Sequence, residues 1–195
     1  MGRGAALAVR EVIDKAKTAI EREDFTTAIN LLRPAAVNGF ADAEFLMGYL
    51  YFTSAAVTKD ESRVWLERAA AKDHARALYY LAGLGESDDF GPPEDDAHGR
   101  LLVRAAELGL AEAQRDLGCF YAIGEYAFPK DEALARLWYG RAAAQGHPDA
   151  QYNLGLMLLY GEGGPAQPEA GIEWVRRAAE QGDTAAVDFL SDYPK

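Results

Sequence analysis

Small and apolar residues recur along the chain in columns with a nearly constant spacing. One column is alanine, and its members are 34, 36, 37 and 36 residues apart: Ala43, Ala77, Ala113, Ala150 and Ala186. Four residues later stands a larger apolar residue and then a small one, as in Leu154 and Gly155. These offsets share one face of a helix. The columns therefore predict a helix in each of the segments 41–51, 75–85, 111–121 and 148–158.

A second set of columns keeps the same step and predicts a second helix in each unit. An Ala-Ala pair recurs, as in Ala142-Ala143, with a large apolar residue such as Trp138 four positions before it. The position four residues after the first alanine of each pair is Gly39, Asp73, Gly109, Gly146 or Gly182. Such a residue ends a helix in a left-handed cap. The pattern predicts an all-α stack of αα hairpins, with a helix at about 5–22 before it and another at about 184–190 after it.

The repeated segments resemble a known family. PDAQYNLGLMLLYGEG (148–163) with AGIEWVRRAAEQGD (170–183) is similar to the Sel1-like repeat, a relative of the tetratricopeptide repeat, and so are 111–126 and 131–150. The resemblance extends over about residues 24–191. It implies a right-handed αα-hairpin solenoid of about four to five repeats in a single domain, 1–195. Residues 1–23 would form an N-terminal capping helix, 24–183 the repeats and 184–195 a C-terminal capping helix.

The resemblance also implies an adaptor or scaffold that binds a protein or peptide along a curved surface. In such arrays the first helix of each unit lines the concave groove. The candidate partner-binding residues on that face are Phe45, Tyr49, Phe52, Arg76, Tyr79, Glu112, Arg115, Tyr152 and Leu156. Aromatic residues beside charges are typical of interfaces. An alternative for the first three is packing against the N-terminal helix.

An acidic segment interrupts the second unit. Its carboxylates are Glu86, Asp88, Asp89, Glu94, Asp95 and Asp96. The segment could be a solvated connection, a contact for a protein partner or a cation site. The spacing is not that of a calcium-binding EF-hand loop, and Pro92-Pro93 interrupts it.

Charge narrows the classes of partner. Lys and Arg number 20 and Asp and Glu number 31, which gives a formal net charge of −11. That balance argues against a nucleic-acid backbone or an anionic membrane and favours a basic protein partner. No apolar run approaches the roughly 20 residues of a membrane-spanning helix, and Cys119 has no second cysteine to pair with. We expect a cytoplasmic protein, monomeric or weakly dimeric, without membrane insertion, metal or cofactor.

No catalytic motif stands out in the sequence. GxSxG, HExxH, GxxxxGK and GxGxxG are all missing. Cys119 is the only nucleophile in the groove columns, and no histidine shares its column. We therefore expect a non-enzymatic adaptor, with neutralisation of a toxin or effector as one form that the family implies. The alternative is a hydrolase acting on a cell-wall-related compound, as has been suggested for some family members.

Overall fold

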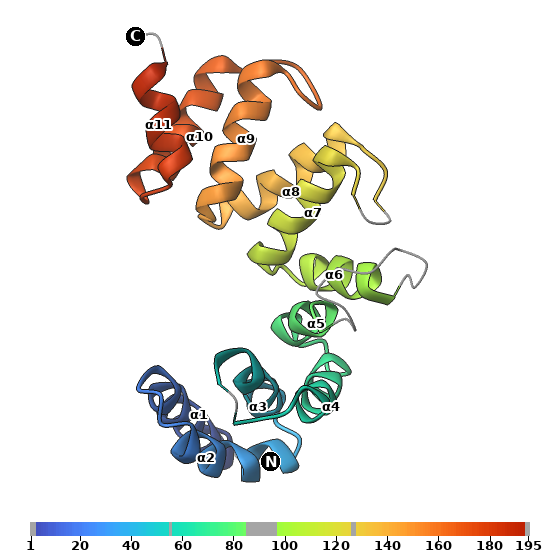
Figure 1. Cartoon of the computed structure of the whole chain (residues 1–195), viewed down its shortest axis with the longest axis vertical. Helices are drawn as coiled ribbons and strands as arrows, with labels where there is room; N and C mark the ends of the chain where they lie inside the picture. The colour runs from blue at the N-terminus through green and yellow to red at the C-terminus, as the bar shows by residue number, and fades with distance from the viewer. Residues whose placement is uncertain (1–2, 55, 85–96, 126–127, 194–195) are drawn as a thin grey trace. The chain divides into compact units, whose positions relative to one another are not determined.

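The computed structural model describes residues 3–54, 56–84, 97–125 and 128–193, and these contain helices and turns without any strand. They belong to two compact units, residues 1–88 and 89–195. The first unit holds α1 (Arg3–Glu21), α2 (Phe25–Val37), α3 (Ala41–Thr53), α4 (Lys59–Ala70) and α5 (Ala75–Ala82). The second holds α6 (Ala97–Glu107), α7 (Ala111–Ile123), α8 (Glu132–Ala144), α9 (Pro148–Tyr160), α10 (Pro168–Glu180) and α11 (Thr184–Asp192) (Figure 1). The all-α prediction is confirmed.

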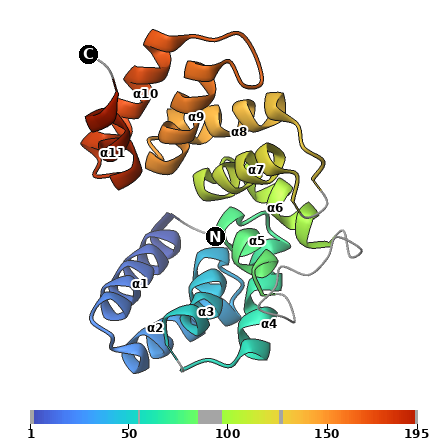
Figure 2. The same cartoon turned by 45° about the horizontal axis from the view of Figure 1, so that its top comes forward.

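Helices that follow one another in the chain pack together as hairpins within each unit. In the first unit α1 packs on α2 and α3 on α4, and in the second unit α7 packs on α8 and α9 on α10. The first helices of successive repeats also contact each other: α5 contacts α3, and α9 contacts α7. Both views place α9, α10 and α11 side by side (Figures 1 and 2). This is the hairpin stack that the columns predict.

The alanine column is the centre of the packing. Its five members, from Ala43 to Ala186, have no exposed surface. Where the small residue after the apolar column is glycine, the two helices of a hairpin approach each other closely. A Cβ atom added at Gly118 would lie 2.6 Å from the Tyr139 ring, and one added at Gly48 would lie 2.6 Å from Leu66 Cγ. Only glycine leaves room for these neighbours.

The turn after each second helix has the left-handed cap that the sequence predicts. Gly146 has φ +91°, and His147 N–H donates to the Ala142 carbonyl oxygen at 3.2 Å. Asp73 takes the same conformation, with φ +58°, because a short polar side chain tolerates it. A cap of this kind fixes the direction in which the next helix leaves.

One predicted helix is shorter than its counterparts. The columns predict a helix through residue 85, but α5 ends at Ala82 after eight residues, whereas α3, α7 and α9 each have 13. Gly83 follows as the cap residue. Glycine in a helix interior costs about 1 kcal/mol relative to alanine, which favours an end at this position.

Candidate functional site

The aromatic residues predicted on α3 pack against α5. The Phe45 ring lies 4.7 Å from the His74 imidazole and 5.8 Å from the Tyr80 ring. Tyr80 also lies 5.1 Å from Tyr49 and 4.9 Å from Phe52. We call these five residues the α3–α5 aromatic cluster. Ring pairs at such separations contribute stability beyond their burial, so one role of the cluster is to hold two successive first helices together.

Members of this cluster differ in how much ring they present to solvent. Phe45 is 6% exposed and belongs to the core, whereas Phe52 is 40% exposed. Tyr49 is half-buried. Among the three predicted α3 aromatics, Phe52 therefore has the most surface for a partner, and Phe45 has almost none.

The two predicted residues of α5 lie at the edge of the cluster. Arg76 is exposed in the first turn of the helix. Tyr79 is half-buried and meets Tyr80 edge to face at 5.6 Å. Tyr80 was not predicted, although it contacts more of the α3 rings than Tyr79 does.

His74 is a helix cap and not a free imidazole. Its Nδ1 accepts from the Ala77 backbone N–H at 3.2 Å, and its Nε2 lies 3.2 Å from Asp42 Oδ1. Burial lowers the pKa of His74, and the Asp42 carboxylate opposes that shift. The neutral ring thus caps α5, donates to Asp42 and stacks on Phe45.

In the second unit, Arg115 connects α7 to α9. Its Nη1 lies 2.8 Å from Asp116 Oδ1, and its Nε lies 4.0 Å from Asp149 Oδ2. The Nε atom is buried and has no hydrogen-bond partner among the described residues. Glu112, one turn earlier, is half-buried. Much of the predicted positive charge of Arg115 is therefore offset by its two acidic neighbours.

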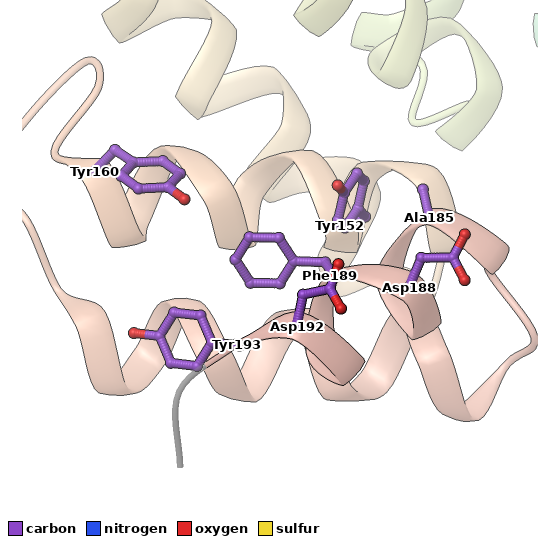
Figure 3. Close-up of a pocket in the computed structure, with 7 residues that line it drawn as sticks. All are labelled: Tyr152, Tyr160, Ala185, Asp188, Phe189, Asp192 and Tyr193. Atoms are coloured by element: carbon purple, nitrogen blue, oxygen red, sulfur yellow. The ribbon is translucent and has the colours of Figure 1, made fainter.

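Tyr152 lines a groove between α9 and α11, shown in Figure 3. The groove has a volume of about 580 Å³. Two of its described lining residues come from α9 and the others from α11 and its cap. They are Tyr152, Tyr160, Ala185, Asp188, Phe189, Asp192 and Tyr193. We call it the α9–α11 groove.

Acidic side chains shape the electrostatics of this groove. Burial raises the pKa of Tyr152, and the negative charges of Asp183 and Asp188 and the neighbouring Tyr160 raise it further. Asp183 is already engaged, because its carboxylate accepts from the Ala186 N–H at 2.9 Å and caps α11. The groove therefore disfavours an added negative charge.

The α11 lining residues were missed by the reading of the sequence. Ala185, Asp188 and Asp192 stand 36 residues after Asp149, Tyr152 and Leu156, so they occupy the groove positions of a first helix. Extending the columns by one unit would have found them. Leu156 itself is half-buried and is not among the described residues that line the groove.

Cys119 belongs to the packing of the second unit. It packs against the buried cluster that contains Tyr139 and Leu154. Burial raises the pKa of Tyr139, and Cys119 beside its hydroxyl raises it further. These surroundings make Cys119 a packing residue.

The predicted acidic segment lies outside the described residues. Asp88, Asp89, Glu94, Asp95 and Asp96 all fall within 85–96. Within the described part of the chain, no group of three or more histidine, cysteine, aspartate or glutamate side chains could hold a metal ion. No helix there combines the length and apolar composition needed to cross a membrane.

The hairpins match a family model. The model of the Sel1 repeat matches residues 41–74, 111–147 and 148–183, which are α3–α4, α7–α8 and α9–α10. The chain belongs to the Sel1 repeat family. Sel1 repeats build protein-binding scaffolds that are generally non-catalytic.

Two relatives show how such repeats occur in longer proteins. An uncharacterized protein of Neisseria meningitidis is 30% identical over 167 residues, which are 85% of this chain and 33% of that protein. Chitin synthase regulatory factor 3 of Schizosaccharomyces pombe is 28% identical over 217 residues, covering 88% of this chain and 23% of the regulator. The chain thus spans about a third or less of these two relatives.

Solved structures give the same fold. A Sel1 repeat protein from Oxalobacter formigenes matches with a TM-score of 0.76 and 28% identity, covering 85% of this chain and 48% of that one. The immunity protein Pa5087 from Pseudomonas aeruginosa matches with a TM-score of 0.60 and 20% identity, covering 94% and 70%. The second likeness shows the fold alone.

Proposed function

We propose that this Sel1 repeat protein is a non-enzymatic adaptor that binds a basic protein or peptide on the exposed faces of its first helices. The observation that carries the proposal is the α9–α11 groove. Its tyrosines and Phe189 provide ring surface, and Asp188 and Asp192 provide negative charge. Aromatic anchors with a polar rim are typical of binding hot spots.

Several findings support this proposal. The family is one of protein-binding scaffolds, and a matching relative is named as a regulator. The net charge of −11 favours encounter with a positively charged surface. Nothing about Cys119 favours the hydrolase alternative, because the side chain is part of the packing around Tyr139.

The specific form that we favour is a cytoplasmic neutralising partner of a basic toxin or effector. The immunity protein among the structural neighbours shares the fold, and an effector that acts on nucleic acid would need basic residues to bind the phosphate backbone. An adaptor for a basic regulatory protein would use the same groove. The two forms differ only in the partner.

Site-specific photocrosslinking tests the proposal. A photoreactive phenylalanine analogue replaces Tyr160, which is 63% exposed at the groove, or Leu137, which is 47% exposed on α8. Cells of the native host are irradiated, and adducts are identified by mass spectrometry. We expect one dominant protein adduct from position 160 only, and the purified adduct partner should bind the unmodified protein. Equal adducts from both positions, or none from position 160, would refute the groove as the binding site.

A further inference from the structure

The lining of the α9–α11 groove has the chemistry of a cation site. Four rings line it; Tyr152 lies 6.3 Å from Phe189, and Phe189 lies 5.4 Å from Tyr193. Two carboxylates, Asp188 and Asp192, complete it, and no basic side chain is among its described lining residues. The face of an aromatic ring attracts a cation.

Both groove carboxylates are without a cationic partner in the described part of the chain. None of the ion pairs there includes Asp188 or Asp192. Asp192 accepts a hydrogen bond from the neighbouring Ser191 hydroxyl at 3.2 Å. Arg177 of α10 is engaged elsewhere, because it lies over the Trp174 ring and pairs with Glu173.

The two carboxylates also lie where one ligand can reach both. Asp188 and Asp192 are four residues apart on α11 and therefore project from the same face of the helix. Figure 3 shows them on the same helix as Phe189, opposite Tyr152 and Tyr160 of α9. The Asp188 carboxylate on α11 interacts electrostatically with Tyr152 on α9, and its charge contributes to the raised pKa of Tyr152.

We propose that the α9–α11 groove binds an arginine side chain of the partner protein, an inference that rests on the proposed function. A guanidinium group is planar, stacks on aromatic faces and donates in parallel to carboxylate oxygens. The ammonium of lysine is a compact and strongly hydrated charge that loses more hydration on a ring face. The groove is open to solvent, so a peptide segment that carries the arginine can continue beyond it.

Peptide titrations of the intact, isotope-labelled protein test the inference. The probe is the acetylated and amidated peptide Gly-Ser-Gly-Arg-Gly-Ser-Gly, and the amide resonances of residues 185–193 are followed by NMR. Three matched peptides carry lysine, norleucine or citrulline in place of arginine; citrulline keeps the shape of arginine without its charge. We expect the arginine peptide to shift these resonances saturably. We expect the lysine peptide to bind about fivefold more weakly, and the citrulline and norleucine peptides at least about tenfold more weakly.

A pair of variants locates the site. Asp188→Asn with Asp192→Asn removes both groove charges and keeps the side-chain shape, and should weaken the arginine peptide by about tenfold. Glu169→Gln with Glu180→Gln makes the same change of net charge on exposed positions of α10, and should change the affinity by less than about twofold. Circular dichroism checks that both variants keep their helices.

Contrary outcomes are distinct from failure of the adaptor proposal. Equal binding of the lysine or citrulline peptide, no shift at residues 185–193, or equal loss in both variants would overturn the arginine assignment. If crosslinking from position 160 still captured a partner, the adaptor would stand with a different occupant of the groove. Loss of both results would remove the adaptor and the arginine site together.

Discussion

At the scale of single residues, one polar contact between two glutamine side chains recurs within the hairpins of the second compact unit. Gln114 donates to the Ala106 carbonyl at 2.9 Å and accepts from the Gln145 amide at 2.8 Å. One unit later, Gln151 accepts from Gln181 at 2.7 Å in the same positions. These pairs satisfy polar groups that the helix packing buries.

In the first compact unit, charged side chains replace the glutamine pair at the equivalent positions. Glu44 occupies the Gln114 position and is fully buried, and Lys72 occupies the Gln145 position. The Glu44 carboxylate accepts from Lys72 Nζ and, at 3.1 Å, from Arg68 Nε. A buried carboxylate depends on its partners, because losing them leaves an unsatisfied charge.

Because glutamines occupy the equivalent positions in the second compact unit, a second substitution at Lys72 should restore stability lost by substituting Glu44. Glu44→Ala should lower the free energy of unfolding by about 2 kcal/mol, below the cost of a fully buried pair because both cations are partly hydrated. Glu44→Gln alone leaves Lys72 without its carboxylate, whereas Glu44→Gln with Lys72→Gln rebuilds the glutamine pair of the second unit. Urea unfolding followed at 222 nm should find the double variant more stable than Glu44→Gln. Equal or lower stability of the double variant would mean that glutamine at position 72 does not rebuild the contact with position 44.

At the scale of helices, glycine decides how closely a hairpin closes. A Cβ at Gly155 of α9 would lie 2.6 Å from Val175 Cγ2 and 2.8 Å from the Gly171 carbonyl oxygen of α10. A Cβ at Gly171 would likewise meet the Gly155 carbonyl at 2.7 Å. The backbones of α9 and α10 therefore approach each other at two facing glycines. Gly140 of α8 differs, since a Cβ there meets nothing within 4 Å.

Two glycine-to-alanine substitutions should therefore change the free energy of unfolding in opposite directions. Gly155→Ala must push α9 and α10 apart and should destabilise the protein by about 2–3 kcal/mol. Gly140→Ala adds a methyl group in open space and should stabilise it by about 0.5–1 kcal/mol through helix propensity. Thermal unfolding of both variants beside the wild type measures this. A neutral Gly155→Ala would show that the hairpin can relax without cost.

The sequence columns predicted the positions of the helices better than the side chains through which successive hairpins contact each other. The glycine and cap positions are fixed by contacts within one hairpin, and these contacts are local in sequence. The faces that meet between hairpins depend on how one helix crosses the next. Tyr79 and Tyr80 point about 100° apart around α5, so the face that α5 turns toward α3 decides which of them meets Phe52. Asp188 and Asp192 were not predicted as groove residues, because the capping-helix prediction for residues 184–195 assigned no groove face to that helix.

At the scale of the whole molecule, stability comes from packing between helices that are close together in the chain. Every well-packed pair of described helices consists of elements that are adjacent or next but one along the chain, such as α9 with α10 or α7 with α9. In arrays of this kind, stability is approximately a sum of terms for each repeat and for the interface with its neighbour. A local defect is therefore expected to act locally.

Hydrogen exchange of the Gly155→Ala variant tests this expectation. Amides of α9 and α10 should exchange about tenfold or more faster than in the wild type, since about 1.4 kcal/mol of lost local stability gives a tenfold change. The helices next to them, α8 and α11, should show a smaller acceleration. The α3 and α4 amides should keep their wild-type rates, because these helices belong to the other compact unit and stability in such arrays depends on neighbouring repeats. A uniform acceleration in all helices would mean instead that the chain opens as one cooperative unit, and that nearest-neighbour packing does not govern its stability.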